Sequence, residues 1–266
     1  MSRPALNVFS IVLDGMPWLA CIYAELMRLT DVDWRWSIAE GAAMNVKDTR
    51  WCSPQAPRLS TDGTSDFLAA IAHNPRVFVK QKVQWAGKVE MCNAALSRFD
   101  RPGVLLQQDS DELWTGDQYR TLLDVFEDHP DIGSACFDCR YFVGPNIVTT
   151  DSADWWRAWR FEPGDQFRTH EPPVMAKPRG RPMLRRETAQ LGLKFDHQSY
   201  TLPQHVAFKE RYYGRRYQGA SRGWKALQES TEFPTAIKRF FPWSADATMV
   251  DRVFNPPDHA RHQAPP

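Results

Sequence analysis

The sequence lacks the marks of several large protein classes. No window approaches the roughly 18 consecutive apolar residues of a membrane-spanning helix, and the first residues do not read as a secretory signal peptide. The 33 lysines and arginines are balanced by 32 acidic residues without a basic stripe, which argues against nucleic acid as a partner. No Gly-x-Ser-x-Gly motif follows a candidate strand, which excludes a common serine-hydrolase arrangement. We expect a cytoplasmic protein, with peripheral membrane contact left open.

Cysteine is also scarce. Of the five cysteines, Cys136 and Cys139 form a lone Cys-x-x-Cys pair, and a zinc site of this kind usually has a second pair. We therefore expect core thiols in a reducing compartment. At 266 residues the chain can bury one sizeable core.

The most informative stretch is an apolar run that ends in acids. Val104-Leu105-Leu106 is followed by Asp109-Ser110-Asp111-Glu112. Asp109 and Asp111 are two positions apart, so in an extended segment their side chains point the same way. Two such carboxylates suit Mg²⁺ or Mn²⁺ held jointly with a phosphorylated substrate. The structural alternative is a strand followed by the acidic first turn of a helix.

The first half of the chain alternates between strand and helix patterns. Strands are predicted at 7–13, 33–39, 77–80 and from 104, and helices at 18–29, 65–72, 87–96 and 117–127. This alternation predicts an α/β protein with a mostly parallel sheet. Asp14, Glu40 and Asp109 each follow a predicted strand, so they should meet at one edge of that sheet.

The second half has a different character. Residues 132–143 and 155–161 read as antiparallel strands, which would make the sheet mixed. Residues 164–182, rich in proline, glycine and arginine, read as an ordered loop beside a cleft or as a mobile flap. Helices are predicted at 203–213 and 221–227, and their basic residues form a local basic face: Lys209, Arg211, Arg215, Arg216 and Arg222. That face is either plainly solvated or in contact with a phosphate-rich ligand. Residues 255–266 read as a disordered tail.

Four features in order resemble one enzyme family. The first strand Ser10-Ile11-Val12-Leu13, the acid Glu40 after the second strand, the helix at 87–96 and the Asp-x-Asp motif Asp109-Ser110-Asp111 resemble glycosyltransferases of the GT-A fold related to family 2. The resemblance covers residues 7 to about 143. It departs from the family at the turn after the first strand, Asp14-Gly15-Met16-Pro17, and at Glu40-Gly41-Ala42.

The resemblance implies a fold and a division of the chain. It implies a GT-A-like (Rossmann-like) mixed, mostly parallel central sheet flanked by helices, with a C-terminal acceptor-side region. Residues 1–143 would form the nucleotide-sugar-binding half, and residues 144–254 the acceptor and metal-completing half of the same domain.

The resemblance also implies an activity and a set of site residues. The activity is metal-dependent, inverting transfer of a sugar from a UDP-, GDP- or dTDP-sugar to a hydroxyl of a glycan, a lipid-linked acceptor or a small molecule, with Mn²⁺ or Mg²⁺ as cofactor. Asp111 would hold the metal with His197, for which His170 and His205 are rivals. The donor would be bound by residues at the strand ends and at one helix start: Leu13, Asp14, Glu40, Lys88, Asp109 and Ser110.

An inverting transferase also needs a general base for the acceptor hydroxyl. Our candidate is Glu171, in His170-Glu171-Pro172-Pro173, with Asp138 and Asp165 as alternatives. The tryptophans of the strand at 155–161 are candidates either for an acceptor pocket or for sheet packing.

Three other hypotheses remain. A nucleotidyltransferase shares the sheet and the metal-binding acids but usually has a Gly-rich basic loop after the first strand, which is missing here. A phosphohydrolase with an aspartyl nucleophile would place a second Asp two residues after Asp14, where Met16 stands. A non-catalytic nucleotide-sugar-binding or scaffolding domain predicts a broken Asp-x-Asp motif, yet the motif is intact.

Overall fold

The computed structural model describes residues 3–150, 152–245 and 247–253. The chain forms two compact units, and both are discontinuous in sequence. Unit 1 comprises Met1–Asp138 and Asp154–Phe195, and unit 2 comprises Cys139–Ala153 and Asp196–Pro266. Strands β6 (Ile132–Gly144) and β12 (Lys194–His197) run from one unit into the other.

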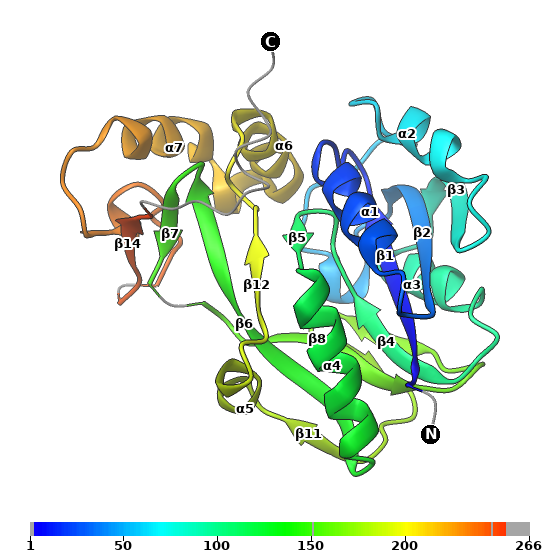
Figure 1. The fold of residues 1–266 in the computed structure, drawn as a ribbon. Helices are drawn as coiled ribbons and strands as arrows, with labels where there is room; N and C mark the ends of the chain where they lie inside the picture. Colours follow the sequence, from blue (N-terminus) through cyan, green and yellow to red (C-terminus); the bar gives the residue numbers. More distant parts are fainter. Residues whose placement is uncertain (1–2, 151, 246, 254–266) are drawn as a thin grey trace. The chain divides into compact units, whose positions relative to one another are not determined.

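Unit 1 is organised by one mixed sheet (Figure 1). Its strand order is β3-β2-β1-β4-β8-β6, in which β1 pairs in parallel with β2 and β4, β2 pairs in parallel with β3, and β8 is antiparallel to both β4 and β6. This order confirms the GT-A-like mixed, mostly parallel sheet predicted from the sequence. The strands are β1 (Ala5–Val12), β2 (Trp34–Ala43), β3 (Val77–Trp85), β4 (Gly103–Gln107) and β8 (Trp155–Phe161).

Helices cover both faces of this sheet. On one face α1 packs near α4, and Tyr23 of α1 stacks on Trp36 of β2 with ring centroids 6.5 Å apart. On the other face α3 packs on β1 and β2. The helical segments of unit 1 are α1 (Trp18–Arg28), η1 (Lys47–Thr49), α2 (Thr64–Ile71), α3 (Lys88–Leu96), α4 (Gly116–Asp128) and α5 (Arg185–Gln190).

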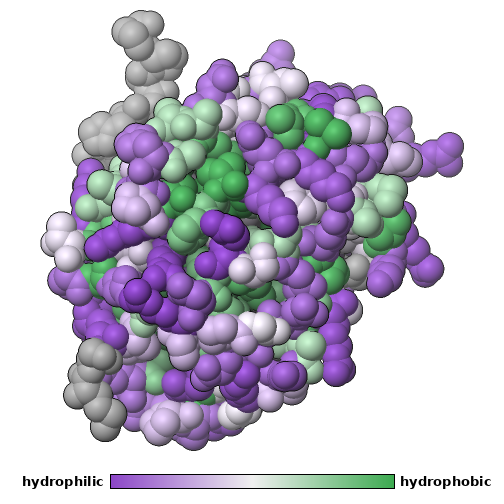
Figure 2. All heavy atoms as spheres, turned by 90° about the vertical axis from the view of Figure 1, so that its right-hand side faces the viewer, coloured by the Kyte–Doolittle hydropathy of each residue, from purple (hydrophilic) through white to green (hydrophobic). Residues whose placement is uncertain are grey.

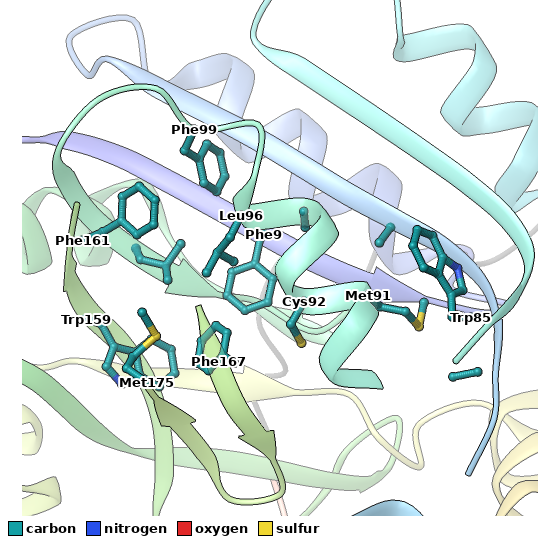
Figure 3. Close-up of a cluster of buried hydrophobic side chains, with 14 residues drawn as sticks. Phe9, Trp85, Met91, Cys92, Leu96, Phe99, Trp159, Phe161, Phe167 and Met175 are labelled. Carbon is teal, nitrogen blue, oxygen red and sulfur yellow. The ribbon is translucent and has the colours of Figure 1, made fainter. Parts of the chain in front are cut away.

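The core beneath α3 joins the parallel and antiparallel parts of the sheet (Figure 3). Phe9 of β1 lies beside Cys92 and Leu96 of α3. The ring of Phe167 packs against the ring of Phe9, with centroids 5.5 Å apart. Phe9 is fully buried. Burying a side chain of this size contributes about 1.5–3 kcal/mol. The cluster therefore fixes the segment after β8 to the strand that leads to Asp14.

Several predicted boundaries differ from the structure, and the third strand, for example, continues past residue 80 to Trp85. The second strand continues to Ala43 through a bulge at Gly41, whose φ of +131° suits glycine. The predicted loop at 164–182 was wrong in part, because it contains β9 (Phe167–His170), which pairs with β10 (Pro173–Met175), and also β11 (Arg181–Met183). Phe167 and Met175 are buried in the core, and this anchoring orders a segment whose proline and glycine content reads as loop.

Unit 2 is smaller and mainly helical. It contains β7 (Ile147–Thr149), α6 (Pro203–Tyr213), η2 (Gly214–Tyr217), α7 (Ala220–Glu229), β13 (Thr235–Ala236), η3 (Ile237–Arg239) and β14 (Met249–Arg252). Strand β14 is antiparallel to β13 and β7. The two helices predicted here are confirmed. The tail predicted at 255–266 lies outside the described residues.

Two further features of the structure concern the hydropathy of its surface and the cysteines of the Cys-x-x-Cys pair. Figure 2 shows a face on which hydrophilic side chains dominate and hydrophobic ones gather in separate small patches. None of the helices within the described residues is long and apolar enough to cross a membrane. Cys136 and Cys139 are buried thiols outside any disulfide, as predicted. Burial raises the pKa of the Cys136 thiol to about 11, which keeps it protonated and unreactive.

Candidate functional site

The turn after β1 lies directly against the Asp-x-Asp segment. A Cβ atom placed on Gly15 would lie 2.9 Å from Cβ of Ser110 and 2.5 Å from Cγ2 of Val12. Only a residue without a side chain allows so close an approach. The structure therefore brings the predicted residues Leu13, Asp14 and Ser110 together at the carboxyl ends of β1 and β4, where open α/β sheets bind ligands.

Gln108 fixes the backbone of the acidic segment. Its backbone N–H donates to the Phe9 carbonyl at 2.9 Å, and its backbone carbonyl accepts from the Ser10 hydroxyl at 2.6 Å. Its side-chain amide accepts from the Tyr119 hydroxyl at 2.8 Å and donates to the Glu112 carbonyl at 2.8 Å. Gln108 is fully buried, so these bonds hold Asp109 and Asp111 in a fixed frame.

The acids do not cap a helix. Helix α4 begins at Gly116, and its N-cap is Thr115, which forms a capping box with Gln118. Asp109 and Asp111 precede the short strand β5 (Glu112–Leu113). The alternative of an acidic first helical turn is therefore wrong for these two acids, which lie just after the carboxyl end of β4.

A buried arginine sits behind the motif. The Nε of Arg157 lies 2.9 and 3.0 Å from the two carboxylate oxygens of Glu112, and its Nη2 donates to Glu112 at 2.6 Å and to Asp109 at 3.1 Å. The side chains of Arg157 and Glu112 are 6% and 0% exposed, whereas that of Asp109 is 29% exposed. Glu112 thus binds the guanidinium from the protein interior, and Asp109 binds it from the partly exposed side. The other carboxylate oxygen of Asp109 accepts from the Gln107 side-chain amide at 3.3 Å, and the side chain remains partly exposed.

Electrostatics keep Asp109 ionised. Burial opposes its charge, but Arg157 and then His170 more than compensate, so the pKa of Asp109 lies below its ordinary value although Asp111 raises it. His170 ends β9, and its Nδ1 lies 3.7 Å from Sγ of Cys92. Of the three candidate histidines, His170 is the one placed in unit 1 with the Asp-x-Asp motif.

Asp14 holds the loop that follows β2. Its carboxylate forms an ion pair with Arg58 and accepts from the Thr61 backbone N–H at 2.8 Å. Burial raises the pKa of Asp14, but Arg58 and Thr61 lower it further, so the net pKa lies below the ordinary value. Asp14 has a φ of +58°, a left-handed conformation that aspartate tolerates better than most residues.

Glu40 is tied to the same loop. It is fully buried, and its carboxylate accepts from the Ser60 N–H at 3.1 Å, the Ser65 hydroxyl at 2.5 Å and the Gln81 amide at 2.7 Å. The bulge at Gly41 lies beside it, where a side chain would come within 1.9 Å of the Lys82 carbonyl oxygen. Glu40 therefore orders the wall of the site, and its predicted contact with the nucleotide base remains a prediction.

The other predicted residues are dispersed. Lys88 begins α3 and is half-buried, and Glu171 is exposed between β9 and β10. His197 and His205 belong to unit 2, where His197 meets the Tyr141 ring with centroids 4.9 Å apart. The role of His197 as a metal ligand remains a prediction.

The alternative bases have structural partners. Asp138 pairs with Lys194 at 2.7 Å. Asp165 pairs with Arg179 and accepts from the Glu162 N–H at 2.9 Å. Both carboxylates therefore stabilise the local chain.

The tryptophans of β8 have three different environments. Trp159 is buried in the core beneath α3. Trp155 stacks on the Arg157 guanidinium, whose carbon lies 4.9 Å from the ring centroid. Trp156 lines a cavity of about 320 Å³ next to Pro172 and Lys177. Trp156 is thus the tryptophan of this strand that combines partial exposure with a cavity.

The carboxylates at the end of β4 suit a metal ion that is held jointly with substrate phosphates better than one that is held by protein ligands alone. No group of three His, Cys, Asp or Glu side chains within the described ranges is arranged to hold a metal ion. Mg²⁺ is commonly held by one or two carboxylates together with substrate phosphates and water. Asp111 and the partly exposed carboxylate of Asp109 match that donor set, since both supply hard anionic oxygen ligands.

Known proteins match this chain among solved structures alone. No protein-family model and no curated protein matches the chain. Among solved structures, S. aureus TarS 1-349 matches 52% of this chain and 36% of its own length, at 13% identity and a TM-score of 0.38. The same fragment in complex with UDP-GlcNAc gives a TM-score of 0.39 at 13% identity, with 52% of this chain and 35% of that chain covered. Similarity at this level assigns no function, and the statement of fold above rests on strand order and direction.

Proposed function

We propose that this protein is a glycosyltransferase that moves a sugar from a nucleotide-diphosphate donor to an acceptor hydroxyl, with a divalent cation and inversion at the anomeric carbon. The observation that carries the proposal is the pair Asp109 and Asp111 at the end of β4, locked by Gln108 and packed against the turn after β1. The β3-β2-β1-β4-β8 order places this pair at the centre of the sheet edge.

The reaction breaks the bond between the anomeric carbon and the diphosphate oxygen, so negative charge develops on the leaving phosphate. Mn²⁺ or Mg²⁺, held by Asp111 with Asp109 alongside, supplies Lewis-acid stabilisation of that charge. Arg157 and His170 keep Asp109 ionised, so its partly exposed carboxylate can accept a further hydrogen bond from a ribose hydroxyl. Leu13, Asp14 and Ser110 border the same edge and would form the donor pocket.

Glu171 is the proposed base. It lies in the exposed turn between β9 and β10, next to His170, and that position lets an acceptor reach it from solvent. A carboxylate there would take the proton of the acceptor hydroxyl as the new glycosidic bond forms. The partner classes remain a glycan, a lipid-linked acceptor or a small molecule.

A ligand-binding measurement tests the donor site. We expect UDP, GDP or dTDP to raise Tm in the presence of Mn²⁺, because a ligand at 100 times its Kd adds about 2.7 kcal/mol to the native state. Asp111→Asn should remove the metal-dependent part. The matched control is Asp117→Asn, whose side chain is 96% exposed on α4 and which should bind as the wild type does.

Three outcomes contradict the proposal. If no nucleoside diphosphate binds at millimolar concentration with either metal, the chain has no donor site of this kind. If sugar 1-phosphate with a nucleoside triphosphate yields a nucleotide sugar, the protein is the alternative nucleotidyltransferase. Binding that is unaffected by Asp111→Asn would favour the non-catalytic alternative.

A further inference from the structure

One cavity of unit 1 is bordered by the hairpin that carries Glu171. It has a volume of about 320 Å³, and all of its lining residues belong to unit 1. Pro172, Pro173, Val174 and Met175 line it from the turn and from β10, immediately after Glu171. Pockets for small organic ligands start at about 300 Å³. A molecule bound in this cavity would therefore touch the segment on which the proposed base lies.

The same cavity extends toward the edge of the sheet at which Asp109 lies. Trp156 of β8 lines it, and the antiparallel pairing of Leu106 with Ala158 places Trp156 toward the carboxyl end of β4. Strand β8 also supplies the arginine that binds Asp109. On the hairpin, His170 is near enough to Asp109 to help lower the pKa of that carboxyl. The cavity and the Asp-x-Asp motif are thus bordered by the same two elements, β8 and the β9–β10 hairpin.

Most of the cavity wall is apolar and offers few hydrogen bonds. Trp156, Trp159, Met175 and four prolines line it, and Trp159 and Met175 lie together in the core beneath α3 (Figure 3). Prolines have no backbone N–H, and among the described lining residues Ser134 is the one neutral side chain with a hydroxyl or amide group. A sugar ring would find few partners here for its hydroxyls, which costs free energy. The wall suits a flat apolar ring, which needs contact area rather than hydrogen bonds.

The charged groups of the wall favour an anion. Three lining side chains are cations, and none of the described lining residues is an acid. Arg179 pairs with Asp165, and Arg160 donates to three backbone carbonyls. Lys177 is exposed, and within the described residues its side chain forms no hydrogen bond or ion pair. Lys177 is therefore the cation of the wall that can meet an anionic group of a ligand.

We propose that this cavity is the acceptor site, and that it takes a small acceptor in which a flat apolar ring carries an anionic group. The ring lies against Trp156, the anion faces Lys177, and a hydroxyl of the ring points toward Glu171. In the transfer, the acceptor oxygen forms a bond to the anomeric carbon as the bond from that carbon to the diphosphate breaks, and the proton of the hydroxyl passes to Glu171. The proposal rests on the proposed function, because it names the acceptor class for the same site.

The test is a calorimetric titration of the full chain with 6-hydroxy-2-naphthoate, which combines the ring, the anion and a hydroxyl. We expect it to bind more tightly than 2-naphthol, which lacks the anion, and more tightly than glucuronate, which carries a carboxylate on a sugar ring. Glucuronate bound as tightly as the naphthoate would overturn the flat apolar ring. Naphthol bound as tightly would overturn the role of the anion, and no binding of the naphthoate at millimolar concentration would overturn the site.

Two variants locate the bound probe. Trp156→Ala should weaken both naphthyl probes about tenfold, because both lose the same ring contact. Lys177→Gln should weaken the naphthoate about threefold to fivefold, as expected for an exposed ion pair, and leave 2-naphthol unchanged. The matched controls are Trp51→Ala, at a partly exposed ring, and Lys80→Gln, at an exposed lysine, both in unit 1 and outside the lining. They should bind within about twofold of wild type, and equal losses in variants and controls would overturn the assignment to this cavity.

Trp156 also packs against the core, so a third variant tests the cavity without disturbing the fold. Val174 lines the cavity with 44% of its surface exposed. Val174→Glu should keep the wild-type Tm and weaken the naphthoate about tenfold or more, because it places a like charge beside the anion. Unchanged naphthoate affinity in a variant with the wild-type Tm would overturn the site.

Nucleotide binding separates this proposal from the proposed function. UDP with Mn²⁺ should leave the affinity for the naphthoate within about twofold, because donor and acceptor occupy separate parts of the site. Exclusion of the naphthoate by UDP would place the cavity in the donor site and overturn its role for the acceptor. If the naphthoate binds but no nucleoside diphosphate shifts Tm, the proposed function fails and the ligand cavity remains. If UDP shifts Tm but Trp156→Ala binds the naphthoate as the wild type does, the acceptor site fails and the donor site remains.

Discussion

The acids at the carboxyl ends of β1 and β2 differ from those at the end of β4. Asp14 and Glu40 make their contacts with residues 58–65 and with β3, through Arg58, Ser60, Thr61, Ser65 and Gln81. Asp109 shares Arg157 with Glu112 and keeps an exposed face. Acids at the same edge of a sheet therefore divide into those that hold a neighbouring loop in place and one that is paired with a buried arginine and remains partly exposed.

The largest effect should come from breaking the ion group behind Asp109. Arg157→Met leaves Glu112 as a buried charge without its cation, and such losses cost about 3–5 kcal/mol. Chemical denaturation should show this decrease in the free energy of unfolding. Arg101→Met, at an exposed pair with Asp33, is the control and should cost less than about 1 kcal/mol. A cost for Arg157→Met as small as that of the control would show that this ion group is hydrated.

The wall formed by Glu40 comes next. Glu40→Ala leaves the Ser60 N–H and the Gln81 amide without their acceptor, which should cost about 1–3 kcal/mol. Glu40→Gln keeps the size and one acceptor oxygen, so it should lose less. If Glu40 instead recognises the nucleotide, Glu40→Gln would leave stability nearly intact while weakening nucleotide binding; denaturation and Tm shifts measured on the same variants separate these outcomes.

The smallest effect concerns the pH dependence of stability. The pKa of Asp14 is lowered in the native state, so its contribution is present above the unfolded pKa and is lost as pH falls through the folded pKa. Asp14→Asn should remove about 1 kcal/mol at neutral pH and make the acid side of the stability profile flatter. Asparagine adopts a positive φ as readily as aspartate does, so the variant should keep the backbone conformation of residue 14. Parallel profiles for variant and wild type below pH 4 would contradict this role.

The sequence predicted helices and strands correctly where the local pattern agrees with the tertiary structure. The predicted helix at 203–213 coincides with α6, and the strands that lead to Asp14 and Asp109 are found where alternation and apolar runs place them. The mixed, mostly parallel sheet also followed from the alternation of strands and helices, whereas its strand order was not predicted.

The partners of the acids could not be predicted. Arg157 lies 48 positions from Asp109, and Arg58 lies 44 from Asp14. A single sequence gives no pairing information at such separations. One signal was present, since an arginine amid Trp155, Trp156, Ala158 and Trp159 is a charge inside an apolar strand and requires a buried partner. The hairpin β9–β10 was missed because its order comes from the distant contact of Phe9 with Phe167.

The discontinuity of unit 1 has a consequence for synthesis of the protein. A chain emerging from the ribosome exposes Glu112 and the edge of β4 well before β8 and Arg157 follow, and β12 comes later still. Until then β4 is an open strand edge, the kind of surface that pairs wrongly with other chains. The first 143 residues are therefore not a module that can be excised, and a shortened version designed for crystallisation or fusion should extend at least through Phe195.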